Sequence, residues 1–500
     1  MWEIEKLKEY ADVYGKAEAV MDAIAAKLRK EPEEAGKMER EMIRVIQETP
    51  MRDEYFIFYL SALIQLFPRA EYVELLLDAV SSSGQLSLQS RDYIWHNLNN
   101  YLIKHPQCES ADVQRKMLEL LDGIEQHVRS MVSVSRKEKA ERNSARVIVM
   151  IRTFLGESHA PSHSALERCK MLQQMGMEVY LVATKEGNYT EPTTPYYMGG
   201  LVQYVREFDG RAMCPYGDHS FYFYQEPIPV ICKEGMQDLI SFVEEVNPYF
   251  ILYIDVESYV ANILNDICPV AAMSVTFSKL RNYRTAFAIT GRSVSEAEKR
   301  AHSYQLLEIP FTFELKEQKR KYTRAELKIP ENVFVLAVVG LRLAYDVTEE
   351  FLAYMKQLRD IHVLFIGIYD GYEEICSRDE WLNAHSTCTG QVDEVIGRLS
   401  CADLYVNPRR LGGGFSVIEA FHAGIPAVTI AYGDVAEAAG SAFCVSDYPE
   451  MIRQIERYQR DNAYYQKMLA CGRKREQEMT DGQAVFEKGI RQMLDSREFF

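Results

Sequence analysis

The sequence predicts an α/β protein in which an all-α domain precedes two doubly wound domains, and three observations support this prediction. Residues 1–137 contain four glycines and carry apolar side chains at helical spacing. From Arg146 onward, short β-branched runs alternate with amphipathic helical stretches, which is typical of parallel sheets covered by helices. The chain has 500 residues, and because one hydrophobic core rarely grows beyond about 250–300 residues, several domains are expected.

The all-helical domain is expected over residues 1–140. Its apolar-periodic stretches are separated by breaks such as KEPEE, FPRA, SSSGQLS and HPQCES, which gives about six helices. No fixed period is evident, so a solenoid is not expected. The last stretch is rich in charged residues and predicts a long helix that ends near Glu141 and leads into the next domain.

The first α/β domain is predicted over residues 144–310. The run RVIVMI, which starts at Arg146, is short, apolar and β-branched, as expected for a buried parallel strand. The helical stretch ALERCKMLQQMG and the strand-like run MEVYLVAT follow it and complete a βαβ unit. The runs YFILYID and PVAAMSV extend the same sheet.

A second α/β domain is predicted over residues 311–475, after a basic linker. Four strand-like runs alternate there with helical stretches: VFVLAVVG, IHVLFIG, DLYVNP and IPAVTI. Helices from Pro449 onward close the chain, and residues 476–500 form a C-terminal helix that could cross back to the first α/β domain. The order of elements therefore predicts two Rossmann-like domains in series.

Three consecutive glycines, Gly412–Gly414, lie between the run DLYVNP and a helix that begins near Phe415. In doubly wound sheets, ligands bind at the carboxyl ends of strands, where loops meet helix N-termini. Bare glycine backbone beside a helix N-terminus favours an anion, most often a phosphate. Arg409 and Arg410 could supply charge to a diphosphate, and Glu419 could accept hydrogen bonds from a ribose diol.

The segment NPRRLGGGFSVIEAFHAGIPAV resembles the nucleotide-sugar site of GT-B glycosyltransferases, and of family 4 (glycosyl transferases group 1) in particular. The pattern of that family is roughly Pro-Ser-x-x-Glu-Gly-Phe-Gly, four residues, Glu-Ala, and then Gly-x-Pro-Val-Val. The resemblance extends from about Arg146 to the end of the chain, and it implies a GT-B fold and a UDP-linked sugar donor whose ribose is held by Glu419. The donor-binding residues expected from the motif and the resemblance are Gly156, Arg342, Arg410, Gly412, Gly413, Gly414, Phe415, Ser416 and Glu419.

Two positions depart from the family pattern. Leu411 stands eight residues before Glu419, where the family has a glutamate that helps to position the donor sugar. After the strand that opens the second domain, Arg342 is kept, but Val347 stands where the family has a lysine. We hypothesise that Arg410 supplies the missing charge, while Arg342 could instead be a surface or helix-capping residue.

The first α/β domain is expected to bind the acceptor, and its loop FLGESHAPSHS carries Gly156, His159 and His163. In GT-B enzymes this loop lies over the cleft, and a histidine there can act as general base because its pKa lies near the operating pH. His159 is the candidate catalytic residue, whereas His163 could lie on the following helix. Asp255 and Glu257 follow a strand and are further catalytic candidates, unless they only begin a capped helix.

The composition is that of an ordinary soluble chain, with 47% apolar residues, 26% charged residues and a formal net charge of −16. This charge argues against nucleic acid as the main partner, since phosphate binding needs concentrated positive charge. Basic runs from Ser135 and Lys316 are solvated helix faces or linkers, or else they make peripheral contact with an anionic membrane surface. Ten scattered cysteines, a charged N-terminus and the lack of an apolar stretch of about 18 residues favour the cytoplasm.

The resulting prediction is a metal-independent glycosyltransferase of hexosyltransferase type that needs no cofactor and acts on a protein or glycan acceptor. All-α domains also precede GT-B pairs in cytoplasmic protein-glycosylating enzymes, so residues 1–140 are expected to bind an acceptor protein or to form a homo- or hetero-oligomer. The alternative is a non-catalytic GT-B-like subunit that recognises an acceptor protein or stabilises a partner transferase, which Leu411 and Val347 favour. A sugar-nucleotide epimerase would share the fold but should carry more acidic residues around the cleft.

Overall fold

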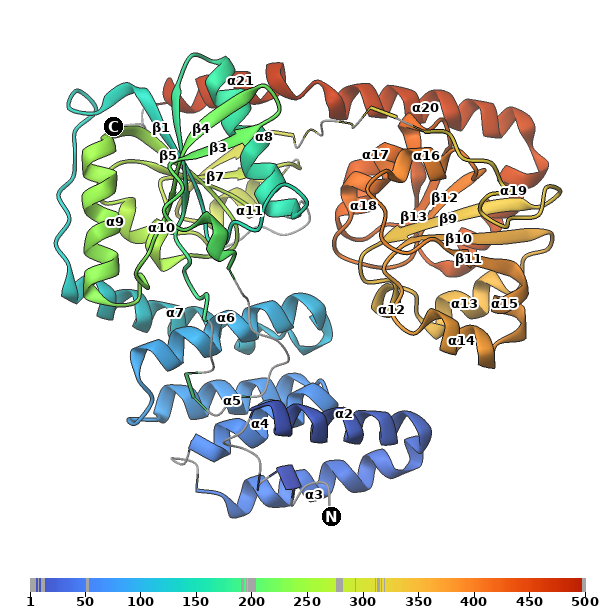
Figure 1. Ribbon diagram of the computed structural model, residues 1–500, viewed down its shortest axis with the longest axis horizontal. Helices are drawn as coiled ribbons and strands as arrows, with labels where there is room; N and C mark the ends of the chain where they lie inside the picture. Colours follow the sequence, from blue (N-terminus) through green and yellow to red (C-terminus); the bar gives the residue numbers. More distant parts are fainter. Residues whose placement is uncertain are drawn as a thin grey trace. The chain divides into compact units, whose positions relative to one another are not determined.

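Figure 1 shows a computed structural model of the chain. The structure describes residues 6–7, 9, 14–50, 54–189, 193–194, 196, 204–275, 282–292, 294–310, 312, 315, 317–318 and 320–496. Lys316, which begins one of the two basic runs, and the last four residues of the predicted C-terminal helix lie outside that range. The chain forms two compact units, of which one consists mainly of Met1–Ala272 and the other mainly of Phe287–Phe499.

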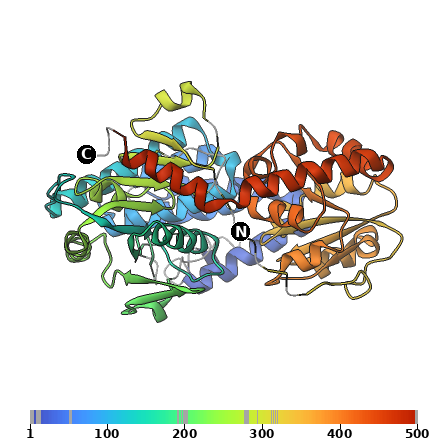
Figure 2. The same ribbon diagram turned by 90° about the horizontal axis from the view of Figure 1, so that it is seen from above.

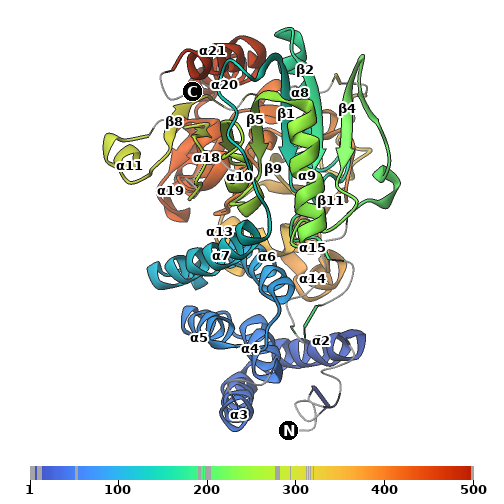
Figure 3. The same cartoon turned by 90° about the vertical axis from the view of Figure 1, so that its left-hand side faces the viewer.

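Six helices in the described part of the chain form the N-terminal region: α2 (Tyr14–Lys30), α3 (Ala35–Glu48), α4 (Glu54–Leu66), α5 (Ala70–Ser82), α6 (Leu88–Lys104) and α7 (Ala111–Met131). Helices α6 and α7 lie between α2–α5 and the first sheet (Figures 1 and 3). Both begin with a serine cap, because the hydroxyl oxygens of Ser87 and Ser110 accept backbone N–H groups at 3.0 and 3.1 Å.

The predicted helix that ends near Glu141 is wrong at its C-terminal end. Helix α7 stops at Met131, and Val132 takes an extended backbone with φ −125° and ψ 162°. The chain then crosses to the α/β domain, where the N–H of Lys137 donates to the carbonyl of Ile267 at 2.9 Å. Charge alone does not continue a helix through β-branched residues when the extended chain finds hydrogen-bond partners on a neighbouring domain.

The first sheet has eight strands in the order β3-β4-β2-β1-β5-β6-β7-β8. Their bounds are β1 (Asn143–Ile151), β2 (Glu178–Ala183), β3 (Met213–Tyr216), β4 (His219–Gln225), β5 (Pro248–Ile254), β6 (Val270–Met273), β7 (Phe287–Thr290) and β8 (Gln305–Glu308). Strand β1 pairs in parallel with β2 and β5, and β4 pairs in parallel with β2, whereas β3 pairs antiparallel with β4. The topological switch point therefore lies between β1 and β5.

Helices cover this sheet and explain its apolar strands. They are α8 (Ala160–Gln174), α9 (Lys233–Val246) and α10 (Tyr259–Leu264), while α11 (Glu296–Arg300) connects β7 to β8 and has no buried residue. Residues 147–151 of β1 and 250–254 of β5 are all buried, as expected for central parallel strands.

The second sheet has six strands in the order β11-β10-β9-β12-β13-β14, and all its pairs are parallel. Their bounds are β9 (Phe334–Gly340), β10 (Ile361–Gly367), β11 (Ser386–Cys388), β12 (Leu404–Asn407), β13 (Ala427–Ile430) and β14 (Cys444–Val445). Counted along the chain, this is the 3-2-1-4-5-6 order of dinucleotide-binding sheets. The switch point falls between β9 and β12.

The helices of the second domain are α12 (Leu343–Asp346), α13 (Glu349–Met355), α14 (Tyr372–Arg378), α15 (Glu380–His385), α16 (Val395–Leu399), α17 (Gly414–His422), α18 (Gly433–Ala439) and α19 (Tyr448–Arg460). Helices α20 (Asn462–Thr480) and α21 (Gly482–Leu494) follow one another at the end of the chain (Figure 2). Helix α21 packs closely against the end of β8, since a Cβ built at Gly489 would lie 2.5 Å from Ile309. No helix among the described residues combines the length and the apolar character that a membrane crossing requires.

Candidate functional site

The candidate site lies at the switch point of the second sheet. Residues 404 and 405 of β12 pair with residues 336 and 337 of β9, so the loops that follow the two strands leave from adjacent positions. These loops bring Arg342 beside the glycine run, because a Cβ built at Gly412 would lie 3.9 Å from an Nη atom of Arg342. Two of the sequence-predicted stretches, 70 residues apart, therefore meet where such folds bind ligands.

Gly413 gives the loop its shape. Its φ of 98° lies in the left-handed region, and it is the N-cap of α17. A Cβ at this position would also lie 2.8 Å from an Nη atom of Arg410. Gly414 is buried as the first residue of α17, and Ser416 holds the turn by donating its hydroxyl to the Gly413 carbonyl at 2.7 Å. Only glycine fits position 413, and the loop exposes backbone at the start of a helix.

Helix α18 fixes the same loop from its other side. The N–H of Asp434 donates to the carbonyl of Leu411 at 2.6 Å. Gly433 approaches the loop so closely that a Cβ there would lie 2.1 Å from the carbonyl oxygen of Arg410. On this side, the path of residues 410–413 is therefore fixed by backbone contacts with α18.

Arg342 and Arg410 take different places in this site. The side chain of Arg342 is 39% exposed and lies 3.8 Å from Asp346, whereas that of Arg410 is 4% exposed and lies 3.4 Å from the same carboxylate. A Cβ built at Gly340 would lie 2.5 Å from Arg410, which places this guanidinium beneath the loop, between the ends of β9 and β12. Arg342 is thus presented at the loop surface, and Arg410 supports the loop from below.

Two polar residues that the sequence analysis did not select complete the support. Asp346 lies between the two arginines, and Tyr405 accepts a hydrogen bond from Arg410 at 3.1 Å and lies 2.7 Å from the Ser416 hydroxyl. Burial raises the pKa of Tyr405, while Arg410 and Ser416 oppose the shift, so its hydroxyl stays neutral. The spacing of Arg342 and Asp346, four residues, was the one sequence signal available for this group.

Glu419 lies in the second turn of α17 and is 8% exposed. Its charge contributes to the raised pKa of Tyr405, which places its carboxylate close to the loop support. Phe415 is half-buried in the first turn of the same helix. All the predicted donor-binding residues from Arg342 to Glu419 therefore gather around one loop.

The predicted residues of the first α/β domain lie at the switch point of its own sheet. Asp255 directly follows β5 and is buried, and its Oδ2 lies 3.6 Å from Nε of Arg152, which directly follows β1. Glu257 is also buried. Helix α10 is capped by Ser258, whose hydroxyl oxygen accepts the N–H of Ala261 at 3.0 Å, so neither carboxylate is the helix cap.

His159 and His163 differ in their surroundings. His159 is the half-buried N-cap residue of α8, with Nδ1 3.0 Å from the hydroxyl of Ser162. Burial lowers the pKa of His159, Asp255 opposes this shift, and Arg152 adds to it. His163 lies on α8 with Nε2 3.5 Å from Glu167. Gly156, with φ 88°, allows the turn of the loop before α8.

Arg152 is a polar residue at this switch point that the sequence analysis missed. A charged side chain immediately after the buried run RVIVMI was the available signal, and a residue in that position lies at the carboxyl edge of the sheet. Among the described residues, no three His, Cys, Asp or Glu side chains are grouped as metal ligands would be.

Two doubly wound domains with a glycine loop at the second switch point define the GT-B class of fold. The glycosyltransferase from Rickettsia africae ESF-5 shares it at 10% identity with a TM-score of 0.53, covering 71% of this chain and 98% of its own. A mutant O-GlcNAc transferase from Thermobaculum terrenum shares it at 12% identity with a TM-score of 0.55, covering 98% of this chain and 96% of its own. The second likeness therefore includes the helical region.

Residues 334–461 match the model of the family Glycosyl transferases group 1. This segment contains β9, the glycine loop and α17, so the resemblance predicted from the sequence is confirmed there, and the GT-B fold is confirmed for both α/β domains. A search of curated proteins returned no match.

Proposed function

We propose that this protein is a glycosyltransferase that moves a sugar from a UDP-linked donor to a protein or glycan acceptor. One observation carries the proposal: the exposed Arg342 side chain lies against a glycine loop that opens helix α17 at the switch point of a 3-2-1-4-5-6 sheet. The match of residues 334–461 to a glycosyltransferase family supports it.

In this proposal the diphosphate of the donor lies on the loop Gly412–Gly414. Backbone N–H groups at the start of α17 would donate to its oxygens, and the partial positive charge of the helix N-terminus would favour the anion. Arg342 would add charge-assisted hydrogen bonds. Glu419 would accept hydrogen bonds from the ribose, and Arg410 would contribute its positive charge from beneath the loop.

The reaction replaces one bond at the anomeric carbon of the sugar. An acceptor hydroxyl or amide attacks that carbon, the bond to the diphosphate oxygen breaks, and UDP leaves with the electron pair. His159 would take the acceptor proton on Nε2, in the tautomer whose Nδ1–H donates to Ser162. Its lowered pKa keeps the imidazole neutral and able to accept that proton. Asp255 and Glu257 are the alternative bases.

The negative charge on the departing diphosphate would be stabilised by Arg342 and by the N-terminus of α17, a role that a divalent metal fills in other enzymes. We therefore propose transfer without a metal. Turnover that is unchanged after EDTA treatment would agree with this, and loss of turnover that Mg²⁺ or Mn²⁺ restores would contradict it.

The alternative function is a non-catalytic GT-B-like subunit, and two observations favour it. Leu411 offers no carboxylate to a donor sugar, and Arg410 is engaged with Asp346 beneath the loop rather than presented at its surface. The cytoplasmic location and the use of residues 1–140 for an acceptor protein or for oligomerisation stay predictions.

A panel of UDP-, GDP- and ADP-linked sugars tests the proposal without knowledge of the acceptor. We expect hydrolysis of at least one UDP-sugar, and a rise in thermal stability with UDP, which at 100 times its Kd amounts to about 2.7 kcal/mol. Binding of UDP without hydrolysis or transfer would favour the non-catalytic subunit. Absence of both effects at millimolar ligand would refute the glycosyltransferase.

A further inference from the structure

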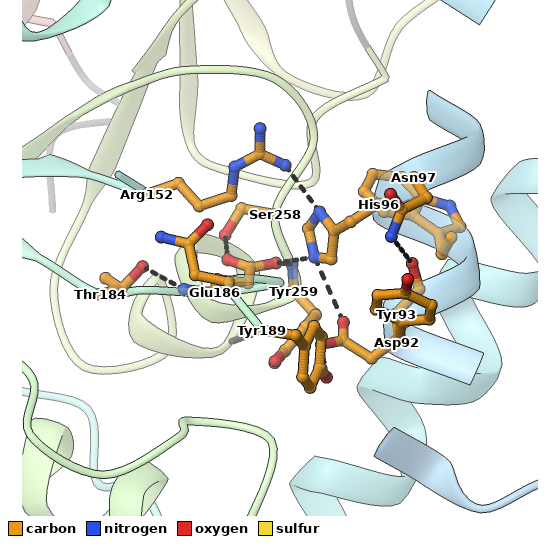
Figure 4. Close-up of polar contacts among 12 residues, drawn as sticks. Asp92, Tyr93, His96, Asn97, Arg152, Thr184, Glu186, Tyr189, Ser258 and Tyr259 are labelled. Atoms are coloured by element: carbon orange, nitrogen blue, oxygen red, sulfur yellow. Dashed lines mark hydrogen bonds and ion pairs between the residues drawn. The ribbon is translucent and has the colours of Figure 1, made fainter. Parts of the chain in front are cut away.

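Helix α6 of the helical region places two buried polar residues against the carboxyl edge of the first sheet (Figure 4). Asp92 and His96 are 1% and 2% exposed, although both lie on a helix that precedes the α/β domain in the chain. The loop after β2 approaches His96 so closely that a Cβ built at Gly187 would lie 2.1 Å from the imidazole ring. The helical region therefore packs against this edge of the sheet through buried side chains of α6.

The imidazole of His96 contacts Arg152. Nδ1 of His96 lies 2.6 Å from an Nη atom of Arg152. Because a guanidinium only donates, Nδ1 accepts this hydrogen bond and the ring proton sits on Nε2. That nitrogen lies 3.2 Å from Asp92, whose other carboxylate oxygen accepts the hydroxyl of Tyr189 at 2.5 Å. The ring thus has a hydrogen bond on its Nδ1 side and a carboxylate close to its Nε2 side.

Arg152 is held between His96 and Asp255. Its Nε lies 3.6 Å from the Asp255 carboxylate, and in Figure 4 one Nη faces His96 while the other points away from the cluster. Arg152 and Asp255 directly follow the two strands that flank the switch point, so the pair lies where this fold class binds ligands.

The charges in the cluster favour this arrangement. Burial lowers the pKa of His96, which keeps the ring neutral and able to accept from Arg152. Burial also raises the pKa of Glu186 to about 8, so this carboxyl, 3.8 Å from His96, is protonated at neutral pH. Arg152 is then the cation of the group, balanced by Asp92 and Asp255.

We propose that His96 is a positioning residue of the acceptor-side site: by holding the guanidinium of Arg152 beside Asp255, helix α6 completes that site. The inference rests on the proposed function and deepens it, because it makes the helical region part of the transferase rather than an appended adaptor. Arg152 would present its outward Nη as a hydrogen-bond donor to a polar group of the acceptor. If the helical region only bound partners, the loss of any one of its buried polar contacts with the α/β domain would affect stability but not turnover.

Substitution of His96 by the two amides tests this. Asn places its amide near the position of Nδ1 and can still accept from Arg152, whereas Gln places its amide near Nε2 and reaches Asp92 instead. We expect His96→Asn to keep kcat within about threefold and His96→Gln to lose roughly 10–100-fold, since a small misplacement of a positioned group costs up to about 10²-fold. The KM for the donor should not change in either variant, because the donor loop lies in the second α/β domain.

Glu125→Ala is the matched control. Glu125 lies on α7, is buried, and accepts a hydrogen bond from Asn262 of α10 at 2.7 Å, so its loss breaks another polar contact between the helical region and the same domain. It should lower the melting temperature without lowering kcat. Tyr189→Phe, which removes one hydroxyl from Asp92, should fold and show a smaller loss of kcat than His96→Gln.

The outcomes separate the two proposals. If the wild type turns over and His96→Gln and Tyr189→Phe have the same kcat as the wild type, the positioning role alone would be overturned. Equal losses in His96→Asn, His96→Gln and Glu125→Ala would also overturn it, because the effect would then follow stability. A wild-type chain that turns over no nucleotide sugar would refute the proposed function, and the positioning role with it.

Discussion

The two α/β domains use their switch points in opposite ways. In the second domain the proposed site is made of exposed glycine backbone, the start of a nine-residue helix and the accessible side chain of Arg342. In the first domain the corresponding position is filled by buried charge, with Arg152 held between Asp255 and a histidine from another region of the chain. Backbone donors suit a diphosphate, which varies little between donors, whereas oriented side chains suit a particular acceptor.

The difference also concerns how far apart in the chain the parts lie. The proposed donor-side site is assembled from residues 340–347 and 405–419, and Gly433 and Asp434 of α18 support it. The proposed acceptor-side site takes residues from α6, from the loop after β2 and from the positions directly after β1 and β5, and Asp92 to Asp255 span more than 160 positions. A substitution in the first kind of site should act locally, and one in the second kind should couple two regions of the protein.

The largest effect is expected from His159→Ala. Loss of a general base lowers turnover by roughly 10²–10⁴-fold. His163→Ala, on the same helix but paired with Glu167, is the matched control and should leave turnover near the wild-type value. Steady-state rates of both variants with one donor measure this. If His159→Ala turns over as fast as His163→Ala, His159 is not the general base, and Asp255 and Glu257 remain as candidates.

Gly413→Ala should come next, with a loss of UDP affinity of about 100-fold or more. An alanine there is strained by about 1–2 kcal/mol at φ 98°, and its Cβ would push Arg410 out from under the loop. Gly424→Ala separates the two causes, because Gly424 has a φ of 82° but open space around its Cβ. The control should lose stability and keep UDP affinity in calorimetric titration; equal affinities in both variants would show that the loop is not the donor site.

The two sites also differ in how well the sequence alone predicts them. The glycine loop, Arg342 and Glu419 lie within short stretches, so motif spacing and family resemblance were enough to predict that they meet around one loop. The contact of His96 with Arg152 joins residues 56 positions apart and leaves no local pattern, because α6 reads as an ordinary helix until its partner domain is in place. Asp346 could have been predicted from the sequence, since it lies four residues, about one helical turn, after Arg342.

The central strands β1, β2, β5, β9, β10, β12 and β13 were all predicted from apolar runs, whereas short edge strands were not. Strands β11 and β14 have three and two residues, too few for a period of two to show. The hairpin of β3 and β4 was missed although its sequence carries a signal. Gly217 and Asp218 form its two-residue loop, with Gly217 at φ 56°, directly before the aromatic-rich run HSFYFYQ.

Substitution of the two arginines of the proposed donor site should affect different quantities: UDP affinity for Arg342 and stability for Arg410. Arg342→Ala should weaken UDP binding by roughly 10–100-fold, the value of charge-assisted hydrogen bonds, with little change in stability. Arg410→Ala should cost about 1–3 kcal/mol of unfolding free energy, because it removes the buried cation beside Asp346 and one of the two hydrogen-bond partners of Tyr405. Denaturant unfolding and UDP titration of both variants measure this. Unchanged UDP affinity in Arg410→Ala would contradict the hypothesis that Arg410 supplies the charge of the family lysine that Val347 replaces.

The last prediction concerns Glu186 and the pH dependence of stability. Its folded pKa of about 8 lies above that of an unfolded glutamate, so between about pH 5 and 8 the folded state holds a proton that the unfolded state has lost. Stability relative to Glu186→Gln should therefore be full at low pH and fall as pH rises through that window, by at most about 1.4 kcal/mol per unit. A constant difference between the two proteins from pH 5 to 8 would contradict the buried, protonated carboxyl.

The central claim is that the loop Gly412–Gly414 binds the diphosphate of a nucleotide-sugar donor. Hydrogen–deuterium exchange with and without UDP measures this where it should occur. We predict slower exchange in peptides that cover residues 410–419 and 341–347, and no such change in Gly413→Ala. Unchanged exchange in both stretches, or protection confined to the first α/β domain, would contradict the account.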